Sequence, residues 1–427
     1  MITRLERLEH AAVLATGLLL AAGFAAAGAG SVFLVWLALA ARRRPLLWDR
    51  TPLDLPILLF VATVAFSVLV SPFPGMAAGS TALLGVLICL GYGAVVRSAA
   101  RKPDFPMRMV EAMAAGTVAG AVWGIVNHRV TGMPADTGGG YNALGTMLVL
   151  GLPLLLALAV RRRGWGFLIF GAGAAVTAIG LVLTFARGAW LGGLAGLAVF
   201  LACVPRPTRL LLLALLVLVL VAGQIGLNGA AASLEQRGES ILDLATNRDR
   251  IAMWKAAFQI FRDHPLMGTG LGTFSLVYPR YRLPEDSEPV PTRPFAHNIF
   301  LNMAAEGGLL GLLTFAGLIT LTLGWGFRWI RQTSGAERVT AAGVVAALVG
   351  VLVHQQVDGT VMRFHIGLGM WMLLGMIAAG AARLRRGRRE GQAVRHPQDD
   401  IEGDLLPDLP VAHRHGEAVA SKGHRVV

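Results

Sequence analysis

Residues 293–308 read RPFAHNIFLNMAAEGG and lead into LLGLLTFAGLITLTLGWGF, an apolar run long enough to cross a bilayer. A spanning helix needs about 20 mostly apolar residues, because the hydrocarbon offers no partners to backbone polar groups. The first turns of this predicted span nevertheless carry polar side chains, at His297, Asn298, Asn302 and Glu306. Polar residues in a span generally face water or the interior of a helix bundle, so this stretch predicts a polar site in a membrane protein.

The composition of the whole chain predicts the same setting. Of its 427 residues 55% are hydrophobic and 15% charged, with a mean hydropathy of +0.62, outside the usual range of soluble domains. No ten-residue alternation typical of a membrane β-barrel is present. We therefore expect an all-α polytopic membrane protein with about twelve transmembrane helices, or eleven if the first two short apolar blocks form one tilted pass. The blocks span residues 11–27, 31–41, 55–70, 77–96, 109–126, 143–160, 165–183, 189–204, 210–227, 299–327, 339–353 and 366–382.

Basic residues set the predicted orientation. They cluster at every second connection between the blocks, and the positive-inside rule places these connections in the cytoplasm. The predicted topology accounts for most of the net charge of +13. The sequence contains no basic patch interleaved with aromatic residues, so a nucleic-acid partner is not expected. The predicted transmembrane domain covers residues 1–386, and the polar stretch 387–427 is expected to be a disordered cytoplasmic tail. The basic clusters lie at residues 42–44, 97–102, 161–163, 206–209, 328–338 and 383–389.

Most of the polar and charged residues that could form a functional site are expected on the opposite, external side of the membrane. The longest external segment, residues 228–296, separates the ninth and tenth predicted spans. Within it, NRDRIAMWKAAFQIFRDHP predicts an amphipathic helix that lies along the membrane surface or packs over the bundle. The apolar residues at helical spacing are Ile251, Trp254, Ala257, Phe258 and Phe261.

Arginines on this side are candidates for binding an anionic substrate. Arg187 lies in LVLTFARGAWLGG, in a turn so short that its guanidinium must stay near the headgroups. It either snorkels as an interfacial anchor beside Trp190 or lines a polar cavity, where its donors match two phosphate or pyrophosphate oxygens. Arg248 and Arg250 begin the amphipathic helix, where a phosphate could also meet free backbone N–H groups.

The polar residues of the opening stretch differ in their expected roles. Asn298, Asn302 and Glu306 recur every four residues and form one stripe of the predicted helix. For Asn302 and Glu306 a structural role is favoured. His297 stands at the mouth of the span, where an imidazole can accept a proton from a bound hydroxyl. A lone histidine is more often structural than catalytic, so residue type alone leaves both roles open.

Four segments together resemble the signature region of the O-antigen ligase and polymerase superfamily. They occur in order within residues 141–320, as YNALGTMLVLGLPLLL, TFARGAWLGG, NRDRIAMWKAAFQIFRDHPLMGTGLGTFSLVYPRY and FAHNIFLNMAAEGGLLGLL. The resemblance implies a GT-C-like membrane glycosyltransferase of the bacterial inner membrane whose site faces the periplasm. It also implies an undecaprenyl-pyrophosphate-linked glycan as donor, lipid A-core as acceptor in the ligase branch, membrane lipids as surroundings, and no cofactor.

The resemblance further implies roles for particular residues. The family's essential histidine falls on His297, and its arginines fall on Arg187 and Arg250, with Arg248 nearby. The arginines would hold the diphosphate while His297 deprotonates the acceptor hydroxyl, and one displacement would invert the anomeric carbon. Supporting residues are expected at Tyr141, Asn142, Asn298, Asn302 and Glu306.

No metal is expected in this site. The close external carboxylates lie in a proline-flanked loop typical of solvated charge, at Glu285, Asp286 and Glu288. Cys89 and Cys203 predict neither a disulfide nor a metal site. The sequence therefore predicts a metal-independent transfer.

Three alternatives remain open. A polymerase of the same superfamily joins one lipid-linked glycan to another. A protein O-oligosaccharyltransferase uses a serine acceptor, although that branch usually carries a larger C-terminal external domain. A twelve-span secondary transporter belongs to a different class and places polar residues near the bilayer midplane. The dissimilar halves of the chain and the polar residues gathered at one mouth favour the glycosyltransferase.

Overall fold

The structure is a computed structural model that describes residues 4–21, 49–205, 209, 245–284 and 295–393. All regular structure in these residues is helical, which confirms the predicted all-α class. The chain divides into two compact units, Met1–Leu384 and Arg385–Val427. The first unit contains the helical bundle.

The helices follow one another through short connections in most of the described chain. A π-helical segment, Ile88–Gly93, joins two of them into the continuous run Pro74–Arg101. Short 3₁₀ turns occupy Val68–Val70, Tyr278–Arg280 and Thr360–Met362. The α-helices are α1 (Arg4–Ala21), α3 (Asp54–Ser67), α4 (Pro74–Leu87), α5 (Ala94–Arg101), α6 (Phe105–Thr131), α7 (Tyr141–Arg161), α8 (Trp165–Leu183), α9 (Arg187–Cys203), α12 (Ala245–Asp263), α13 (Phe274–Val277), α14 (Ile299–Gln332), α15 (Gly335–His354) and α16 (Phe364–Ala393).

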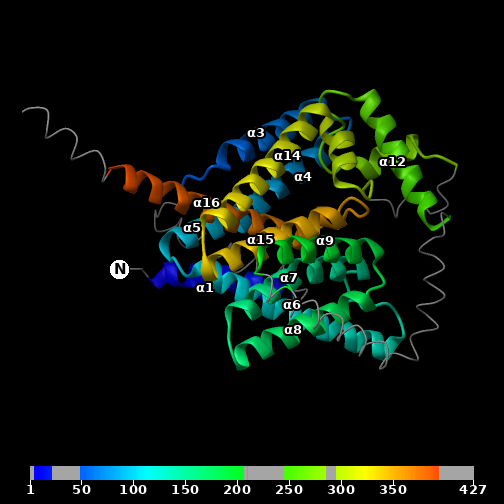
Figure 1. The fold of residues 1–427 in the computed structure, drawn as a ribbon. Coiled ribbons are helices and arrows are strands. Elements are labelled where there is room, and N and C mark those ends of the chain that lie inside the picture. Colours follow the sequence, from blue (N-terminus) through cyan, green and yellow to red (C-terminus); the bar gives the residue numbers. More distant parts are fainter. Residues whose placement is uncertain (1–3, 22–48, 206–208, 210–244, 285–294, 394–427) are drawn as a thin grey trace, which may run out of the picture. The chain divides into compact units, whose positions relative to one another are not determined.

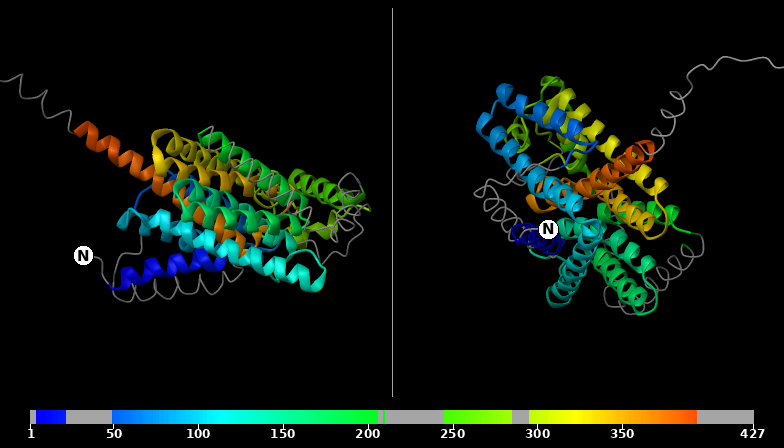
Figure 2. Two further views of the ribbon diagram at one scale, coloured as in Figure 1. Left: turned by 60° about the horizontal axis from the view of Figure 1, so that its bottom comes forward. Right: turned by 90° about the vertical axis from the view of Figure 1, so that its left-hand side faces the viewer.

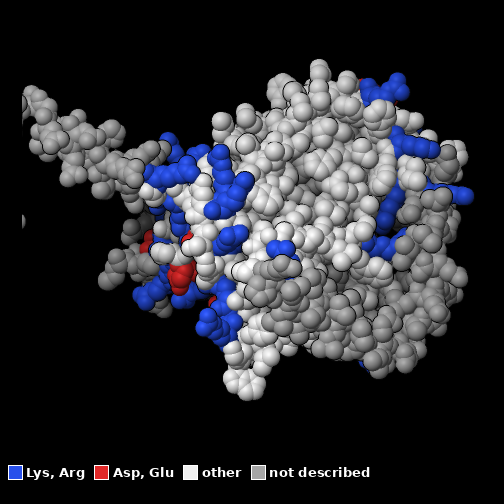
Figure 3. Space-filling view, in the orientation of Figure 1, with Lys and Arg blue, Asp and Glu red and all other residues white. Residues whose placement is uncertain are grey.

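Seven helices of the described chain are long and apolar enough to cross a membrane. They span Pro74–Arg101, Phe105–Thr131, Tyr141–Arg161, Trp165–Leu183, Ile299–Gln332, Gly335–His354 and Ile366–Arg388. Two shorter apolar helices, Asp54–Val70 and Arg187–Cys203, fall on two further predicted blocks. The blocks at residues 31–41 and 210–227 lie outside the described residues, so the total of twelve stays a prediction. Figure 3 shows a mainly uncharged surface between two ends that carry the charged residues, as expected where lipid surrounds the middle of the helices.

The last helix continues past the predicted domain boundary. The sequence predicts disorder from residue 387, but α16 runs to Ala393. This difference arises because the stretch LRRGRRE is rich in arginine, a good helix former that also tolerates water. Residues 394–427 lie outside the described part of the chain.

Glycines bring α9 unusually close to α15. A Cβ on Gly192 would lie 2.5 Å from the carbonyl oxygen of Gly350, and one on Gly196 would lie 2.9 Å from that of Ala346. Small residues allow such approach between membrane helices. α7 packs against the same pair, and Figures 1 and 2 show the three helices side by side. The N-terminal ends of α7 and α9 therefore meet the C-terminal end of α15.

The predicted span at residues 299–327 is not one continuous helix. α14 breaks at Gly308, whose φ of 61° and ψ of −160° suit only glycine. Residues 265–270, here called the plug loop, fill the break with their own backbone, as membrane burial demands. The four hydrogen bonds run from Thr269 N to Ala305 O (3.1 Å), Gly270 N to Glu306 O (2.8 Å), Leu309 N to Pro265 O (2.8 Å) and Leu310 N to Leu266 O (3.2 Å).

The contact between the plug loop and the break leaves no room for side chains at two glycines. A Cβ on Gly308 would lie 2.4 Å from the carbonyl carbon of Leu266. A Cβ on Gly268 would lie 2.4 Å from the carbonyl carbon of Glu306. The sequence did not predict the break, because the apolar pattern continues unchanged through it.

α12 packs through a face that overlaps only in part with the one that the sequence predicted, since Ala257 is buried as expected. Its buried face consists of small and flexible residues, which pack with Phe274 and Ala305. The predicted apolar residues Ile251 and Phe258 are instead 40% and 54% exposed. The helix thus has an inner apolar face against the protein and an outer one free to meet lipid. The buried residues of α12 are Ala252, Met253, Ala256, Ala257 and Ile260.

Gly308→Ala should destabilise the protein, because alanine must leave the observed backbone conformation and displace Leu266. We expect a loss of about 2 kcal/mol or more, measured as a lower midpoint of thermal unfolding in detergent. Gly317→Ala is the matched control, since it lies in the same helix and nothing stands within 4 Å of its Cβ position. Equal midpoints for the two variants would contradict a dependence of the fold on this break.

Candidate functional site

The connection between α15 and α16, residues 355–363, folds into a buried turn, here called the α15–α16 loop. Gln355 holds it through both amide atoms: Oε1 accepts from Val361 N (2.9 Å) and Nε2 donates to Thr360 Oγ1 (3.0 Å). Asp358 Oδ1 accepts from the next two backbone N–H groups at 2.7 and 2.9 Å. These three polar side chains are buried, so the loop is a fixed surface on which other segments assemble.

His354, the last residue of α15, connects this loop to α7. Its Nδ1 lies 3.0 Å from Thr146 Oγ1, which also lies 2.8 Å from Thr360 Oγ1. Because the Thr146 hydroxyl donates its one proton to the carbonyl of Asn142 (2.9 Å), it accepts from both other groups, which places a proton on Nδ1 of the imidazole. The network fixes the first turn of α7, where Asn142 is half-buried and Tyr141 exposed.

Asn298 ties the start of α14 to the same loop. It lies just before the helix with an extended backbone, and its Oδ1 caps the helix by accepting from the N–H groups of Phe300 and Leu301, both at 3.0 Å. Its Nδ2 donates to Gln356 O at 3.0 Å. The backbone N–H of Ile299 donates to the loop as well, to Gln355 O at 2.9 Å. Asn298 is thus a cap, and only Asn302 and Glu306 lie within the helix proper.

His297 precedes the cap in a constrained conformation. Its φ of 51° is uncommon for a residue with a side chain. Such a conformation costs about 1–3 kcal/mol and persists where neighbouring contacts enforce it. Here Asn298 is held by the loop, and the Phe295 ring packs edge-on against the imidazole with centroids 5.1 Å apart. The half-buried imidazole is therefore held in place beside the α15–α16 loop.

Asn302 and Glu306 brace the segments around this position. Asn302 Oδ1 accepts from the backbone N–H of Ala296 at 3.0 Å, immediately before His297. Glu306 Oε1 accepts from the backbone N–H of Phe274 at 2.9 Å, where α13 begins after the plug loop. Both side chains are buried, and these contacts support the structural role that the sequence favoured.

Arg187 lies at the edge of the same loop. α9 begins at this residue, after Phe185 in a left-handed conformation. The following Gly188 packs so closely on the loop that a Cβ there would lie 2.5 Å from Val357 Cγ2 and 3.0 Å from His354 Cδ2. The backbone of Arg187 therefore lies next to the α15–α16 loop, at the positive end of the α9 dipole, and its side chain is half-buried.

Arg250 approaches the loop from α12. Burial raises the pKa of Asp358, and the positive charge of Arg250 opposes that rise. The same charge acts on His354. Asp358 Oδ2 has no hydrogen-bond partner among the described residues, so its attraction to Arg250 is electrostatic. Arg187, Arg250 and the segment of His297 thus surround one loop, whereas Arg248 is exposed and makes no polar contact within the described chain.

The structure shows the contacts of residues to which the sequence assigned no role. Asp358 and Arg363 do not form an ion pair in the described chain, because Arg363 Nη1 donates to the carbonyl of Gly139 instead. The polar run HQQVDGTVMRFH at residues 354–365 was the available signal for this loop. Nothing in the sequence indicated that Thr146 belongs to this network, since a threonine in an apolar span usually forms hydrogen bonds only within its own helix.

The described residues contain no group of three or more His, Cys, Asp or Glu side chains placed to hold a metal ion. The carboxylates at Glu285, Asp286 and Glu288 lie outside the described part of the chain. Metal independence therefore stays a prediction.

A bundle of apolar helices with a polar site built from the loops at one end defines a multi-pass helical membrane protein. A family model described as O-Antigen ligase matches residues 172–316 of the chain. This stretch contains Arg187, Arg250 and His297. The match confirms the resemblance seen in the sequence and supports membership in the O-antigen ligase superfamily, whose members are membrane glycosyltransferase-like enzymes. No curated protein matches the chain.

Glu306→Gln should preserve glycosyl transfer and most of the stability, because glutamine keeps an oxygen acceptor for the Phe274 N–H and loses only part of the bonding to Gly272 and Asn302. Glu306→Ala should lower stability by about 1–3 kcal/mol, since it leaves that buried donor unpaired. The unfolding midpoint and the transfer rate of both variants measure the effect. A glutamine variant that is stable but inactive would show instead that the carboxyl group takes part in the reaction.

Proposed function

We propose that this protein is an O-antigen ligase that transfers glycan from undecaprenyl pyrophosphate to a sugar hydroxyl of lipid A-core. The observation that carries the proposal is the gathering of Arg187, Arg250 and His297 around the α15–α16 loop. Two cations suit a diphosphate, and an imidazole suits a hydroxyl that must lose its proton.

The ends of the helices support an external position for this site. α7 and α9 run from the α15–α16 loop to basic residues at their other ends, and α15 runs in the opposite sense. Under the positive-inside rule the arginine-rich end faces the cytoplasm, so the loop faces the periplasm in an inner-membrane protein. A periplasmic site is where a lipid-linked glycan and lipid A-core would meet.

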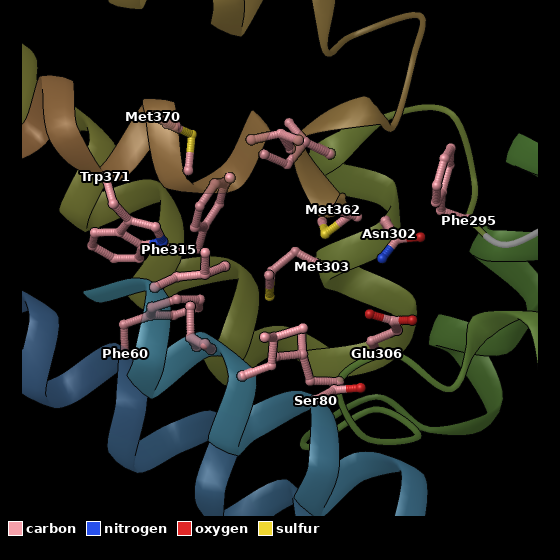
Figure 4. Close-up of a pocket in the computed structure, with 18 residues that line it drawn as sticks. Phe60, Ser80, Phe295, Asn302, Met303, Glu306, Phe315, Met362, Met370 and Trp371 are labelled. Carbon is pink, nitrogen blue, oxygen red and sulfur yellow. The ribbon is translucent and has the colours of Figure 1, made fainter. Parts of the chain in front are cut away.

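An apolar cavity of about 140 Å³ lies beside this site (Figure 4). Phe295 and Val361 line it, and they belong to the segment before His297 and to the α15–α16 loop. The rest of its wall comes mainly from apolar side chains of α3, α4, α14 and α16, among them Phe60, Leu83, Phe315, Met370 and Trp371. Ser80, Asn302 and Glu306 add polar groups to this wall. A mainly apolar cavity next to a cationic site suits a substrate whose phosphate carries a lipid chain.

The proposed reaction is one displacement at the anomeric carbon of the sugar linked to pyrophosphate. The acceptor oxygen forms the new glycosidic bond as the bond to the phosphate oxygen breaks, so the configuration inverts and undecaprenyl pyrophosphate leaves. Arg187 and Arg250 hold the diphosphate and stabilise the charge that develops on it, without a divalent metal. His297 accepts the acceptor's proton. Because a sugar hydroxyl is a far weaker acid than an imidazolium, proton transfer accompanies bond formation and contributes about 100- to 10,000-fold.

His297→Ala should reduce transfer by about 100-fold or more while leaving the protein folded. Purified protein in nanodiscs would receive labelled lipid-linked glycan and lipid A-core in buffer containing EDTA, and product would be separated by mass. His264→Ala is the matched control, a histidine after α12 whose side chain has no part in the proposed site, and it should stay near wild type.

Each outcome of that assay discriminates between the functions considered. Near wild-type transfer by His297→Ala would remove the imidazole from the chemistry. Wild-type activity that EDTA abolishes and magnesium restores would contradict a metal-free reaction. Product formed only on a second lipid-linked glycan would identify a polymerase. The same protein in sealed proteoliposomes separates the remaining class: movement of substrate across the bilayer without any new glycosidic bond would identify a transporter.

Arg187→Ala and Arg250→Ala should each lower kcat/KM for the donor by about 10- to 100-fold, the effect of losing a charge-assisted hydrogen bond to phosphate. The KM for lipid A-core should stay constant. Arg262→Ala removes an exposed cation from the same helix as Arg250 and should have no effect. Unchanged donor kinetics in either of the first two variants would place that arginine outside the diphosphate site.

A further inference from the structure

The ends of α7, α9 and α15 opposite to the α15–α16 loop enclose a second hollow, here called the arginine pocket. Its volume is about 710 Å³, and four arginines line it: Arg161, Arg163, Arg209 and Arg338. No Asp or Glu of the described chain lies in its wall. Four guanidinium groups therefore share one hollow in which the described residues place no carboxylate.

Arg161 is fixed within this pocket. Its Nη1 donates to the carbonyl oxygen of Ala336 at 2.7 Å and to Thr340 Oγ1, which ties the end of α7 to the first turns of α15. Because one guanidinium nitrogen makes both bonds, Nε and Nη2 remain to bind an anion.

The nearest carboxylates, which act on Arg161 through their charge, have other partners. Glu111 accepts from Arg162 at 2.9 Å, on the neighbouring helix α6. Glu337 accepts from the indole N–H of Trp329 at 3.0 Å. The charge of Arg161 is thus only partly compensated inside the pocket.

Arg209 supplies a donor that lacks a partner. Its Nη2 donates to Val204 O at 3.3 Å, but its buried Nε has no hydrogen-bond partner among the described residues. The charges of both Arg209 and Arg338 reach the thiol of Cys203, so the two cations lie near the same wall of the pocket. A buried donor of a cation without a partner is unfavourable, and an anion would remove that penalty.

An ordinary basic cluster at a membrane edge extends into water and keeps its charges apart. Arg163 and Arg338 are exposed in this way, but Arg161 and Arg209 are half-buried. Like charges in one hollow repel one another unless an anion lies between them. Phosphate oxygens suit such a place, because a guanidinium fork binds two of them at once.

We propose that the arginine pocket binds the phosphate of an anionic phospholipid headgroup from the leaflet opposite to the α15–α16 loop. Val160, Val204 and Val339 form part of its wall, so acyl chains can continue from the headgroup along apolar helices. A lipid bound there joins α7, α9 and α15 at one end. The other ends of these helices carry Thr146, Arg187 and His354, so the lipid stabilises the framework of the proposed active site.

Titration of purified protein in detergent with dioleoyl phosphatidylglycerol tests this proposal. Native mass spectrometry should show binding about tenfold tighter than that of dioleoyl phosphatidylcholine, and the unfolding midpoint should rise with the anionic lipid only. Equal binding of the two lipids would overturn the proposal. Sodium phosphate tests whether a soluble anion binds instead. If phosphate displaces the lipid at equal concentration, the proposal of a lipid ligand is overturned and the pocket binds a free anion.

Arg163→Gln combined with Arg338→Gln should weaken phosphatidylglycerol binding about tenfold or more, since two charged contacts to phosphate are lost. Both residues are exposed, so the unfolding midpoint without lipid should not change. Arg328→Gln combined with Arg331→Gln removes the same charge from exposed positions near the end of α14 and should stay within about twofold of wild type. Equal weakening by the two pairs would show diffuse surface attraction and overturn the pocket.

Discussion

The backbone exchange between the plug loop and the broken helix α14 is the contact on which the rest of the structure depends. A helix interrupted at membrane depth releases carbonyl and N–H groups that lipid cannot satisfy. The plug loop forms hydrogen bonds with two backbone carbonyl groups before Gly308 and with two backbone N–H groups after it. The broken helix and the plug loop therefore depend on each other for these hydrogen bonds. Since α12 ends just before the plug loop, this contact also sets the distance between Arg250 and His297, which a long segment separates in sequence.

The proposed site is shared among segments that each contribute one part. α7 provides the hydroxyl that bonds to His354, α9 provides Arg187, α12 provides Arg250, and the cap of α14 provides His297 and Asn298. The α15–α16 loop touches or faces all of them and uses its own buried polar groups to keep its shape. Its carboxylate at Asp358 provides negative charge that attracts Arg250 in the absence of substrate. A diphosphate would then replace one anionic partner by another.

Hydropathy predicted the described helices well, because lipid exposure and backbone burial demand long apolar runs. The block 143–160, for example, became α7 at Tyr141–Arg161. Arg187, Arg250 and His297 were named from the resemblance and from their residue types. The break at Gly308 was missed because a local pattern does not report which distant backbone will bind it. For the same reason the spacing in α12 revealed apolar residues without showing that Ala252 and Ala256, and not Ile251, face the protein.

The α15–α16 loop follows α9, α12 and the cap of α14 in the sequence, and this order has a consequence for how the molecule matures. Ribosomes release the chain from its N-terminus, so α9 and α12 emerge well before this loop does. Until the final hairpin inserts, Asn298 and Ile299 have no loop carbonyls to bind. A nascent or truncated molecule would therefore sit in the bilayer with its parts unassembled. The parts of the proposed site therefore come together only after the α15–α16 loop has been made.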